Sequence, residues 1–197
     1  MFWTLSCSDL VMHDVTGSTY RASTTTTVYT IGHSTRPIEE FLDLLRQNGV
    51  GLLADIRTIP KSRRNPQYWH DALAASLAGA GIAYRALPAL GGRRRTTPDS
   101  INTAWRNLSF RGYADYMQTD AFAAGVDQLV TLAGERTTAI MCAEAVPWRC
   151  HRSLVGDALL ARGVRVLDII SATSVRPHAL TPWARVAGTT ITYPGDM

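Results

Sequence analysis

The sequence has few cysteines, and their number is odd. Three occur among 197 residues, and Cys7 is far from Cys142 and Cys150 along the chain. A small secreted scaffold held together by disulfides needs several cysteine pairs. The sequence therefore excludes that class of protein, and we expect a cytoplasmic protein with reduced thiols.

Long hydrophobic runs are also absent. No stretch approaches the ~18 consecutive apolar residues that indicate a membrane-spanning helix. The first residues lack the basic start and unbroken apolar segment of a secretory signal. We therefore expect no membrane partner. The hydrophobic share of 46% and the charged share of 18% are typical of a globular protein, and the length suits one domain with a full core.

Lysine is nearly missing, since Lys61 is the only lysine among 20 basic residues. The net charge of the whole chain is +4, but residues 57–95 hold eight basic residues against the single acidic Asp71, which gives this segment a net charge of +7. A genome rich in arginine codons would explain the lysine deficit, but not the clustering. Because arginine binds phosphate in a bidentate manner, the cluster predicts a phosphate-bearing partner, either a small molecule or a nucleic acid.

Composition divides the chain into three parts. Residues 1–27 are rich in serine and threonine and show no sustained period, which predicts a flexible N-terminal extension. Residues 28–170 form a single α/β domain in our interpretation. Residues 171–197 contain the turn formers Pro177, Pro182, Gly188 and Pro194, and we expect a peripheral C-terminal tail there.

Short apolar runs alternate with segments of helical periodicity in the central part. The runs predict strands at residues 28–31, 52–56, 82–87, 138–142 and 164–169. Between them, helical spacing predicts helices near 37–48, 69–77, 122–133 and 153–162, with short helical pieces in 100–118. This alternation implies right-handed crossovers. The sequence therefore predicts an α/β fold, a three-layer Rossmann-like domain with about five mainly parallel strands flanked by helices.

Unusual residues follow each of the first four predicted strands. Ligands of open parallel sheets bind beyond the carboxyl ends of the strands, so we expect these residues to meet at one edge. His33 and Ser34 follow the first strand. Asp55 ends the second strand, and Arg57, Ser62 and Arg63 lie in the loop after it. Gly91, Gly92 and Arg93 follow the third strand, and Cys142 and Glu144 follow the fourth.

The segment 141–152 carries the densest chemistry, with two thiols, a carboxylate, an imidazole and two guanidiniums in twelve residues. An apolar run precedes it and an amphipathic pattern follows, which predicts a strand, a loop and a helix. We expect the first turn of that helix to carry Cys150, His151 and Arg152. Helix N-termini favour anions and thiolates, so this loop is the predicted centre of the site.

The two thiols of this segment allow four interpretations. Cys142 could be a nucleophile, although six residues separate it from Arg149 where a phosphatase loop has five. Cys142, Glu144, Cys150 and His151 are ligand types that suit zinc, but adjacent Cys150 and His151 do not form a standard zinc spacing, and we assign no metal site. The thiols could also support anion binding by the helix N-terminus, or be buried structural residues.

Individual roles follow from the residue types. Among the candidate catalytic residues, His33 is a possible general acid or base, or alternatively a capping or core histidine. Cys142 and Glu144 are the other two; Glu144 could instead bind a metal or hold Arg152. Asp55 could orient Arg57, bind a ligand hydroxyl or cap a turn. We expect Arg57, Arg93 and Arg152 to bind negative charge.

Four of these motifs carry a family resemblance. They are Tyr-Thr-Ile-Gly-His-Ser-Thr at 29–35, Asp-Ile-Arg-Thr-Ile-Pro-Lys-Ser-Arg at 55–63, Leu-Gly-Gly-Arg at 90–93, and Cys-Ala-Glu at 142–144 with Cys-His-Arg-Ser at 150–153. Together they resemble the family called domain of unknown function 488, over about residues 29–169. The resemblance implies that these motifs belong together, but the family has no assigned activity.

We therefore expect an enzyme that binds a phosphate-bearing ligand, a nucleotide or nucleic acid, at the carboxyl edge of a parallel sheet. Trp148 is the aromatic side chain best suited to stack on a base. The alternatives are a non-catalytic nucleic-acid-binding module and a Cys/His metal-binding protein. The sequence does not identify the substrate, the reaction, a cofactor or a protein partner.

Overall fold

A computed structural model describes residues 26–61 and 63–195 of the chain. The predicted N-terminal extension therefore lies outside the described residues, apart from its last two positions, and so does Ser62. Thr27 is already the first residue of a strand. In the described part of the chain, no helix is long and apolar enough to cross a membrane.

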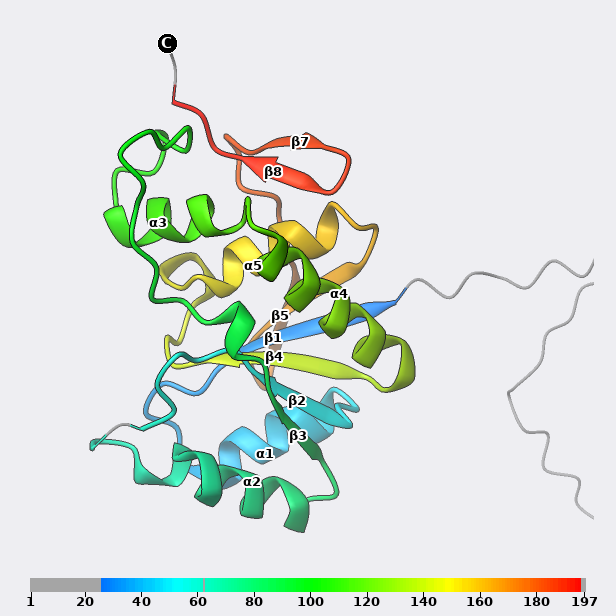
Figure 1. Cartoon of the computed structure of the whole chain (residues 1–197). Helices are drawn as coiled ribbons and strands as arrows, with labels where there is room; N and C mark the ends of the chain where they lie inside the picture. The colour runs from blue at the N-terminus through cyan, green and yellow to red at the C-terminus, as the bar shows by residue number, and fades with distance from the viewer. Residues whose placement is uncertain (1–25, 62, 196–197) are drawn as a thin grey trace, which may run out of the picture.

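The centre of the molecule is a six-stranded sheet in the order β3-β2-β4-β1-β5-β6 (Figure 1). Its strands are β1 (Thr27–Gly32), β2 (Leu52–Asp55), β3 (Ala83–Ala86), β4 (Thr138–Cys142), β5 (Arg165–Ser171) and β6 (Ser174–Pro177). Neighbours from β3 to β5 pair in parallel, and β6 pairs antiparallel with β5. The predicted α/β fold with five mainly parallel strands is confirmed, and β6 adds an edge strand to it.

Helices cover both faces of this sheet. They are α1 (Ile38–Gln47), α2 (His70–Gly79), α3 (Leu108–Tyr116), α4 (Asp120–Glu135) and α5 (Arg152–Leu160), with short 3₁₀ turns η1 (Pro66–Tyr68), η2 (Pro88–Leu90) and η3 (Pro147–Arg149). Figure 1 shows α1 and α2 below the sheet and α3, α4 and α5 above it. The three-layer arrangement is therefore as predicted.

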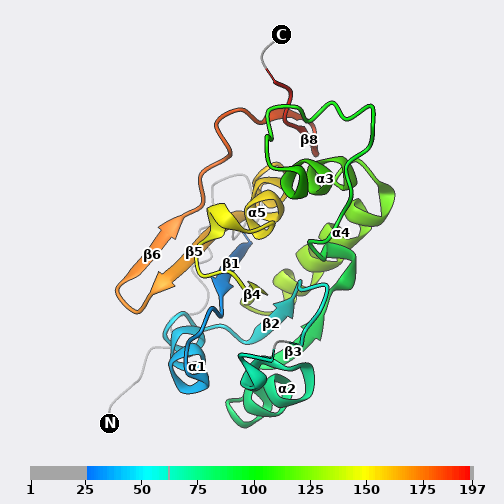
Figure 2. The same cartoon turned by 90° about the vertical axis from the view of Figure 1, so that its left-hand side faces the viewer.

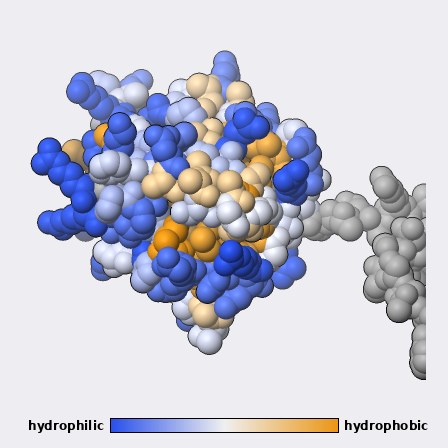
Figure 3. All heavy atoms as spheres, turned by 90° about the horizontal axis from the view of Figure 1, so that it is seen from below, coloured by the Kyte–Doolittle hydropathy of each residue, from blue (hydrophilic) through white to orange (hydrophobic). Residues whose placement is uncertain are grey.

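The strand period of two divides the apolar residues between two cores. In β4, Ala139 and Met141 belong to the core under α1 and α2, whereas Ile140 and Cys142 belong to the core under α3, α4 and α5. This alternation turns the thiol of Cys142 toward α5. Seen from the side of α1 and α2, the surface is hydrophilic around its rim, with less polar and hydrophobic residues near its centre (Figure 3).

The C-terminal segment, for which we expected a peripheral tail, contributes strands and buried side chains. It supplies β6, which lies beside β5 (Figure 2). It also supplies the hairpin of β7 (Arg185–Ala187) and β8 (Thr190–Thr192), and Figure 2 shows β8 next to α3. The Tyr193 side chain is fully buried, and its hydroxyl donates to Asp157 Oδ2 at 2.8 Å. The turn formers of this segment separate very short strands, which a periodicity argument does not detect.

The start of α5 also differs from the prediction. The helix begins at Arg152, so Cys150 and His151 precede it instead of lying in its first turn. Cys150 ends the 3₁₀ turn η3, and His151 occupies the N-cap position without a side-chain capping hydrogen bond. Cys150 and His151 therefore lie in the loop before the helix, at the carboxyl ends of the strands.

Candidate functional site

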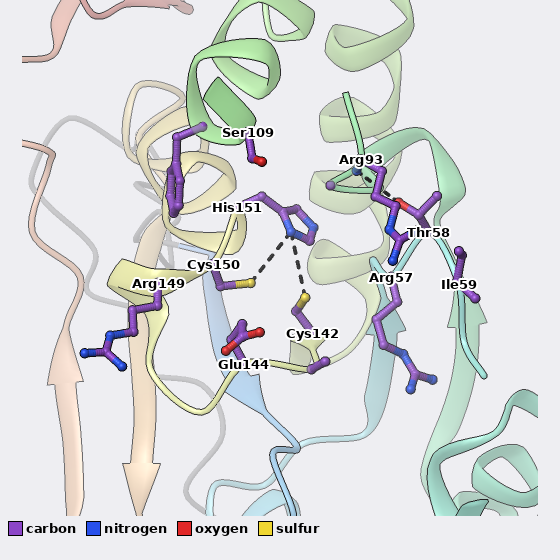
Figure 4. A pocket seen from close by; sticks show the side chains of 13 residues that line it. Arg57, Thr58, Ile59, Arg93, Ser109, Cys142, Glu144, Arg149, Cys150 and His151 are labelled. Carbon is purple, nitrogen blue, oxygen red and sulfur yellow. Dashed lines mark hydrogen bonds between the residues drawn. The ribbon is translucent and has the colours of Figure 1, made fainter. Parts of the chain in front are cut away.

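A cavity of about 320 Å³ lies beyond the carboxyl ends of β2 and β4 (Figure 4). The residues that line it come from three segments that follow β2, η2 and β4, and from the first turn of α3. They are Arg57, Thr58, Ile59, Gly92, Arg93, Ser109, Phe110, Cys142, Ala143, Glu144, Arg149, Cys150 and His151. Seven of the residues expected from the sequence thus meet here, at the predicted edge of the sheet.

Two sulfur atoms and an imidazole form the centre of one wall. Nδ1 of His151 lies 3.8 Å from Cys142 Sγ and 3.7 Å from Cys150 Sγ. Figure 4 shows both sulfur atoms directed at this nitrogen. Cys142 ends β4 and the other two residues precede α5, so the chain returns to the same point after the loop 143–149.

The orientation of the His151 ring is set on its opposite side. Nε2 lies 3.0 Å from the carbonyl oxygen of Ile56, which can only accept a hydrogen bond, so Nε2 carries the proton. In the neutral ring the lone pair of Nδ1 therefore faces the two sulfur atoms. Ile56 directly follows β2, and the register of β2 against β4 fixes the position of this carbonyl.

The two thiols differ in their acidity. A hydrogen bond from the Cys150 thiol, together with His151 nearby, holds the pKa of Cys142 well below its ordinary value. Donating this hydrogen bond, with burial in addition, raises the pKa of Cys150 well above its ordinary value. The arrangement therefore favours a thiolate at Cys142, the form that acts as nucleophile and metal ligand.

Positive charge reaches the cavity from Arg93 and Arg149. Both side chains are exposed, and neither guanidinium makes an ion pair or hydrogen bond with another described residue. Arg149 was not among the site residues expected from the sequence. Arg149 lies on the 3₁₀ turn η3 at the edge of the cavity, and its guanidinium extends away from the thiols (Figure 4). No sequence signal distinguishes it from Arg152.

Arg152 is buried and does not line the cavity, in contrast to its expected role as an anion ligand. Its guanidinium donates to the carbonyl oxygens of Glu144 at 2.7 Å and Ala145 at 3.0 Å. The close contact depends on Gly32, where a Cβ would lie 1.7 Å from the Glu144 carbonyl oxygen. Arg152 thus binds the main chain of the loop that carries Glu144, not the Glu144 carboxylate.

Arg57 lines the cavity but is held by a buried ion pair. Its Nε and Nη2 donate to the carboxylate of Asp55 at 2.9 and 2.6 Å, and the backbone N–H of Arg57 also donates to it. The hydroxyl of Tyr84 donates to the same carboxylate at 2.8 Å. Asp55 therefore both orients Arg57 and caps the turn, and it does not line the cavity.

His33 lies behind Arg57 and not in the cavity. Its Nδ1 donates to the carbonyl oxygen of Ser34 at 2.8 Å, so Nε2 is free to accept from Arg57 Nη1 at 3.3 Å. The ring is 2% exposed and stacks on Tyr68 at 4.1 Å. Burial lowers the pKa of His33, which favours the neutral ring. His33 therefore contacts Arg57 and does not line the cavity.

The remaining expected residues lie outside the cavity lining. Ser34 donates its backbone N–H to the carbonyl oxygen of Ala143 at 2.8 Å, which joins the loops after β1 and β4. Gly91 is buried against Thr58, whose Oγ1 would lie 2.8 Å from a Cβ. Arg63 is exposed on its loop, and Ser62 lies outside the described residues.

Trp148 is 63% exposed, and it faces a different cavity. That second cavity, of about 390 Å³, lies between the 147–148 turn and the C-terminal segment, where Trp148, Trp105 and Trp183 line it. The aromatic side chain in the first cavity is Phe110, from the start of α3. The short helical pattern of that region gave no signal for a site.

Comparison with known families decides the classification. The family model described as "Domain of unknown function DUF488" matches residues 37–159. The chain belongs to the DUF488 family. The match includes every residue that lines the cavity, and it begins after His33 and Ser34. No curated protein and no solved structure matches this DUF488 domain.

Proposed function

We propose that this DUF488 protein is an enzyme that binds a phosphate-bearing substrate, a nucleotide or a nucleic acid, and acts on it beside Cys142, Glu144 and His151. One observation carries the proposal. A single cavity is lined by Arg93 and Arg149, whose guanidiniums have no partner among the described residues, by a sulfur–imidazole centre and by the carboxylate-bearing Glu144.

The charge distribution supports a phosphate group as the recognised part of the substrate. The cavity lining holds Arg57, Arg93 and Arg149 against the single carboxylate of Glu144. The exposed Arg93 and Arg149 are free to form bidentate hydrogen bonds with phosphate oxygens. The guanidinium of Arg57 is bound to Asp55, so its contribution is mainly a fixed positive charge in the wall.

The size and walls of the cavity support a ligand of nucleotide class. Its volume of about 320 Å³ is within the usual range of small-molecule sites, ~300–1,000 Å³. Phe110 and Ile59 supply apolar surface, and the Ser109 hydroxyl and Thr58 lie beside them as polar groups. A nucleotide can place its phosphate against the arginines and its base against the apolar surface of Phe110.

The reactive groups support catalysis rather than binding alone. A simple anion site needs positive charge and N–H groups, but not a thiolate, an imidazole and a carboxylate on the same wall. In this arrangement Glu144 can accept or donate a proton, and Cys142 favours the thiolate form. The candidate catalytic residues are therefore Cys142 and Glu144, with His151 facing the thiols.

Binding is tested first by titration calorimetry with inorganic phosphate, nucleoside mono-, di- and triphosphates, and short single- and double-stranded oligonucleotides. The double variant Arg93→Ala/Arg149→Ala is expected to weaken the best ligand at least tenfold, because each lost charge-assisted hydrogen bond contributes ~1.5–3 kcal/mol. Arg185→Ala, which removes an exposed arginine of β7, is the matched control and leaves binding unchanged.

Turnover of the ligand found in this way then separates an enzyme from a binding module. Glu144→Gln is expected to bind the ligand normally and to abolish its conversion. If oligonucleotides bind with strong salt dependence, no conversion occurs, and binding survives Glu144→Gln and Cys142→Ser, the protein is a non-catalytic nucleic-acid-binding module and the proposal is wrong.

A further inference from the structure

Cys142, Cys150 and His151 form a group of three metal-ligand atoms at one point. Both sulfur atoms and an imidazole nitrogen all lie within 4.8 Å of one another, and the Sγ–Nδ1 distances are 3.8 and 3.7 Å. Ligands at ~2.3 Å (sulfur) and ~2.0 Å (nitrogen) in a tetrahedral zinc site lie roughly 3.5 Å apart. The side chains therefore need little movement to hold one ion.

The imidazole is prepared for a metal by its hydrogen bond to the main chain. Metal-binding histidines usually donate their second ring N–H to a carbonyl or carboxylate, which fixes the tautomer and the ring plane. Here Nε2 of His151 donates to the Ile56 carbonyl oxygen at 3.0 Å, and the Nδ1 lone pair faces the sulfur atoms. Tyr113 packs beside the ring, with 5.0 Å between centroids.

We propose that Cys142, Cys150 and His151 bind a zinc ion whose fourth position opens into the cavity. Two sulfurs and one imidazole suit zinc, whereas magnesium and calcium prefer oxygen ligands. Three protein ligands with an open position are typical of catalytic zinc sites; structural sites use four. Both cysteines are free thiols, and all three residues line the cavity that also contains Glu144.

The role of the ion rests on the proposed function and narrows it to hydrolysis, in which Cys142 holds the ion and a zinc-bound hydroxide, not the thiolate, attacks the substrate. Zinc lowers the pKa of a bound water to near neutrality. Glu144 accepts a proton from this water, and the resulting hydroxide forms a bond to an electrophilic carbon or phosphorus of the phosphate-bearing substrate. The bond to the leaving group breaks, and Glu144 returns the proton to that group. One water is consumed, and no oxidant or reductant is needed.

Zinc content of the full chain, purified under reductant without a histidine tag and loaded with zinc, tests the site. Elemental analysis is expected to find about one zinc per wild-type chain after desalting, and less than a tenth of that in Cys150→Ser and His151→Ala. His70→Ala, which removes an exposed histidine outside the group, is the matched control and keeps the metal. Circular dichroism verifies that each variant is folded.

Cobalt substitution supplies a test that does not depend on the variants folding. Cobalt(II) added to metal-free wild-type protein is expected to give a sulfur-to-cobalt charge-transfer band and the visible d–d bands of a tetrahedral ion, both saturating at one equivalent. A wild-type protein that retains no zinc and gives no such bands overturns the inference. A variant without Cys150 or His151 that keeps stoichiometric zinc also overturns it.

These outcomes separate the metal site from the proposed function. Zinc bound at one equivalent, with no phosphate-bearing ligand found by calorimetry, supports the metal site and contradicts the proposed function. A ligand that binds through Arg93 and Arg149 in a protein that cannot hold zinc supports the proposed function and contradicts the metal site. Hydrolysis that needs zinc and is lost in Glu144→Gln, while the zinc content is unchanged, supports both.

Discussion

Gly92 packs against the ring of His151 so closely that a Cβ at residue 92 would lie 2.3 Å from Nδ1. The neighbour of this glycine is therefore a side chain of the candidate site. Because Nε2 on the other side of the ring is hydrogen-bonded to the Ile56 carbonyl oxygen, the ring cannot move away from residue 92 without disturbing this hydrogen bond.

Gly92→Ala is therefore expected to displace His151 while the fold remains intact. Zinc affinity should fall about 10- to 100-fold, as for lost supporting contacts around a metal ligand, in a competition assay with a chelator. Gly134→Ala is the control, since a Cβ there meets nothing within 4 Å and should change neither zinc affinity nor fold. Equal affinities of Gly92→Ala and wild type would mean that the ring is not held as described.

Arg152 is expected to affect stability rather than ligand contacts. Arg152→Met leaves the carbonyl oxygens of Glu144 and Ala145 without their donors, and buried groups that lose a partner cost ~1–3 kcal/mol each. The free energy of unfolding, measured with urea, should fall by about 2–5 kcal/mol. Arg46→Met, at an exposed ion pair, should change it by less than ~0.5 kcal/mol. A fully stable Arg152→Met protein would contradict this role.

The buried pair of Asp55 and Arg57 predicts a second stability effect. Asp55→Asn leaves a buried guanidinium without its counter-charge, which typically costs ~3–5 kcal/mol, and Tyr84→Phe removes a single hydrogen bond worth ~1 kcal/mol. Urea unfolding should rank the two variants in that order. Asp71→Asn changes a fully exposed carboxylate and should be neutral. The opposite ranking would show that the pair is not the main anchor of this loop.

His178 predicts a loss of stability at alkaline pH. Burial disfavours its charged form, but hydrogen bonds from the ring to Asp157 and Asp168 outweigh burial and raise its pKa from 6.5 to about 9. A pKa raised by folding means that the folded state binds the proton more tightly than the unfolded state. The stabilisation is therefore complete below pH 6.5 and is lost as the pH rises through 9.

The matching measurement is urea unfolding at a series of pH values from 6 to 10. The wild-type free energy of unfolding should decline most steeply between the two pKa values of His178, 6.5 and about 9. His178→Asn, which keeps a hydrogen-bond donor but does not titrate, should be less stable at pH 6 and show a flatter profile. If His178→Asn kept the full slope, another group would be responsible.

Much of the fold followed from the sequence because burial is periodic along strands and helices. β4 has the predicted bounds, and the other four predicted strands agree within two residues at each end. The rule that ligands meet the carboxyl edge of a parallel sheet then brought Gly92, Arg93 and Cys142 to one place without knowledge of any contact. The short strands β6, β7 and β8 escaped detection, since three or four residues carry no period.

The sequence by itself determined the α/β class and the group of reactive residue types after β4. Only the tertiary structure decided that Arg149 lines the cavity while Arg152 is buried, and that His151 rather than His33 faces the thiols. The physical reason is that the direction of a loop side chain depends on partners distant in the sequence. The carbonyl of Ile56 and the missing Cβ of Gly92 orient His151, and neither relationship leaves a local pattern.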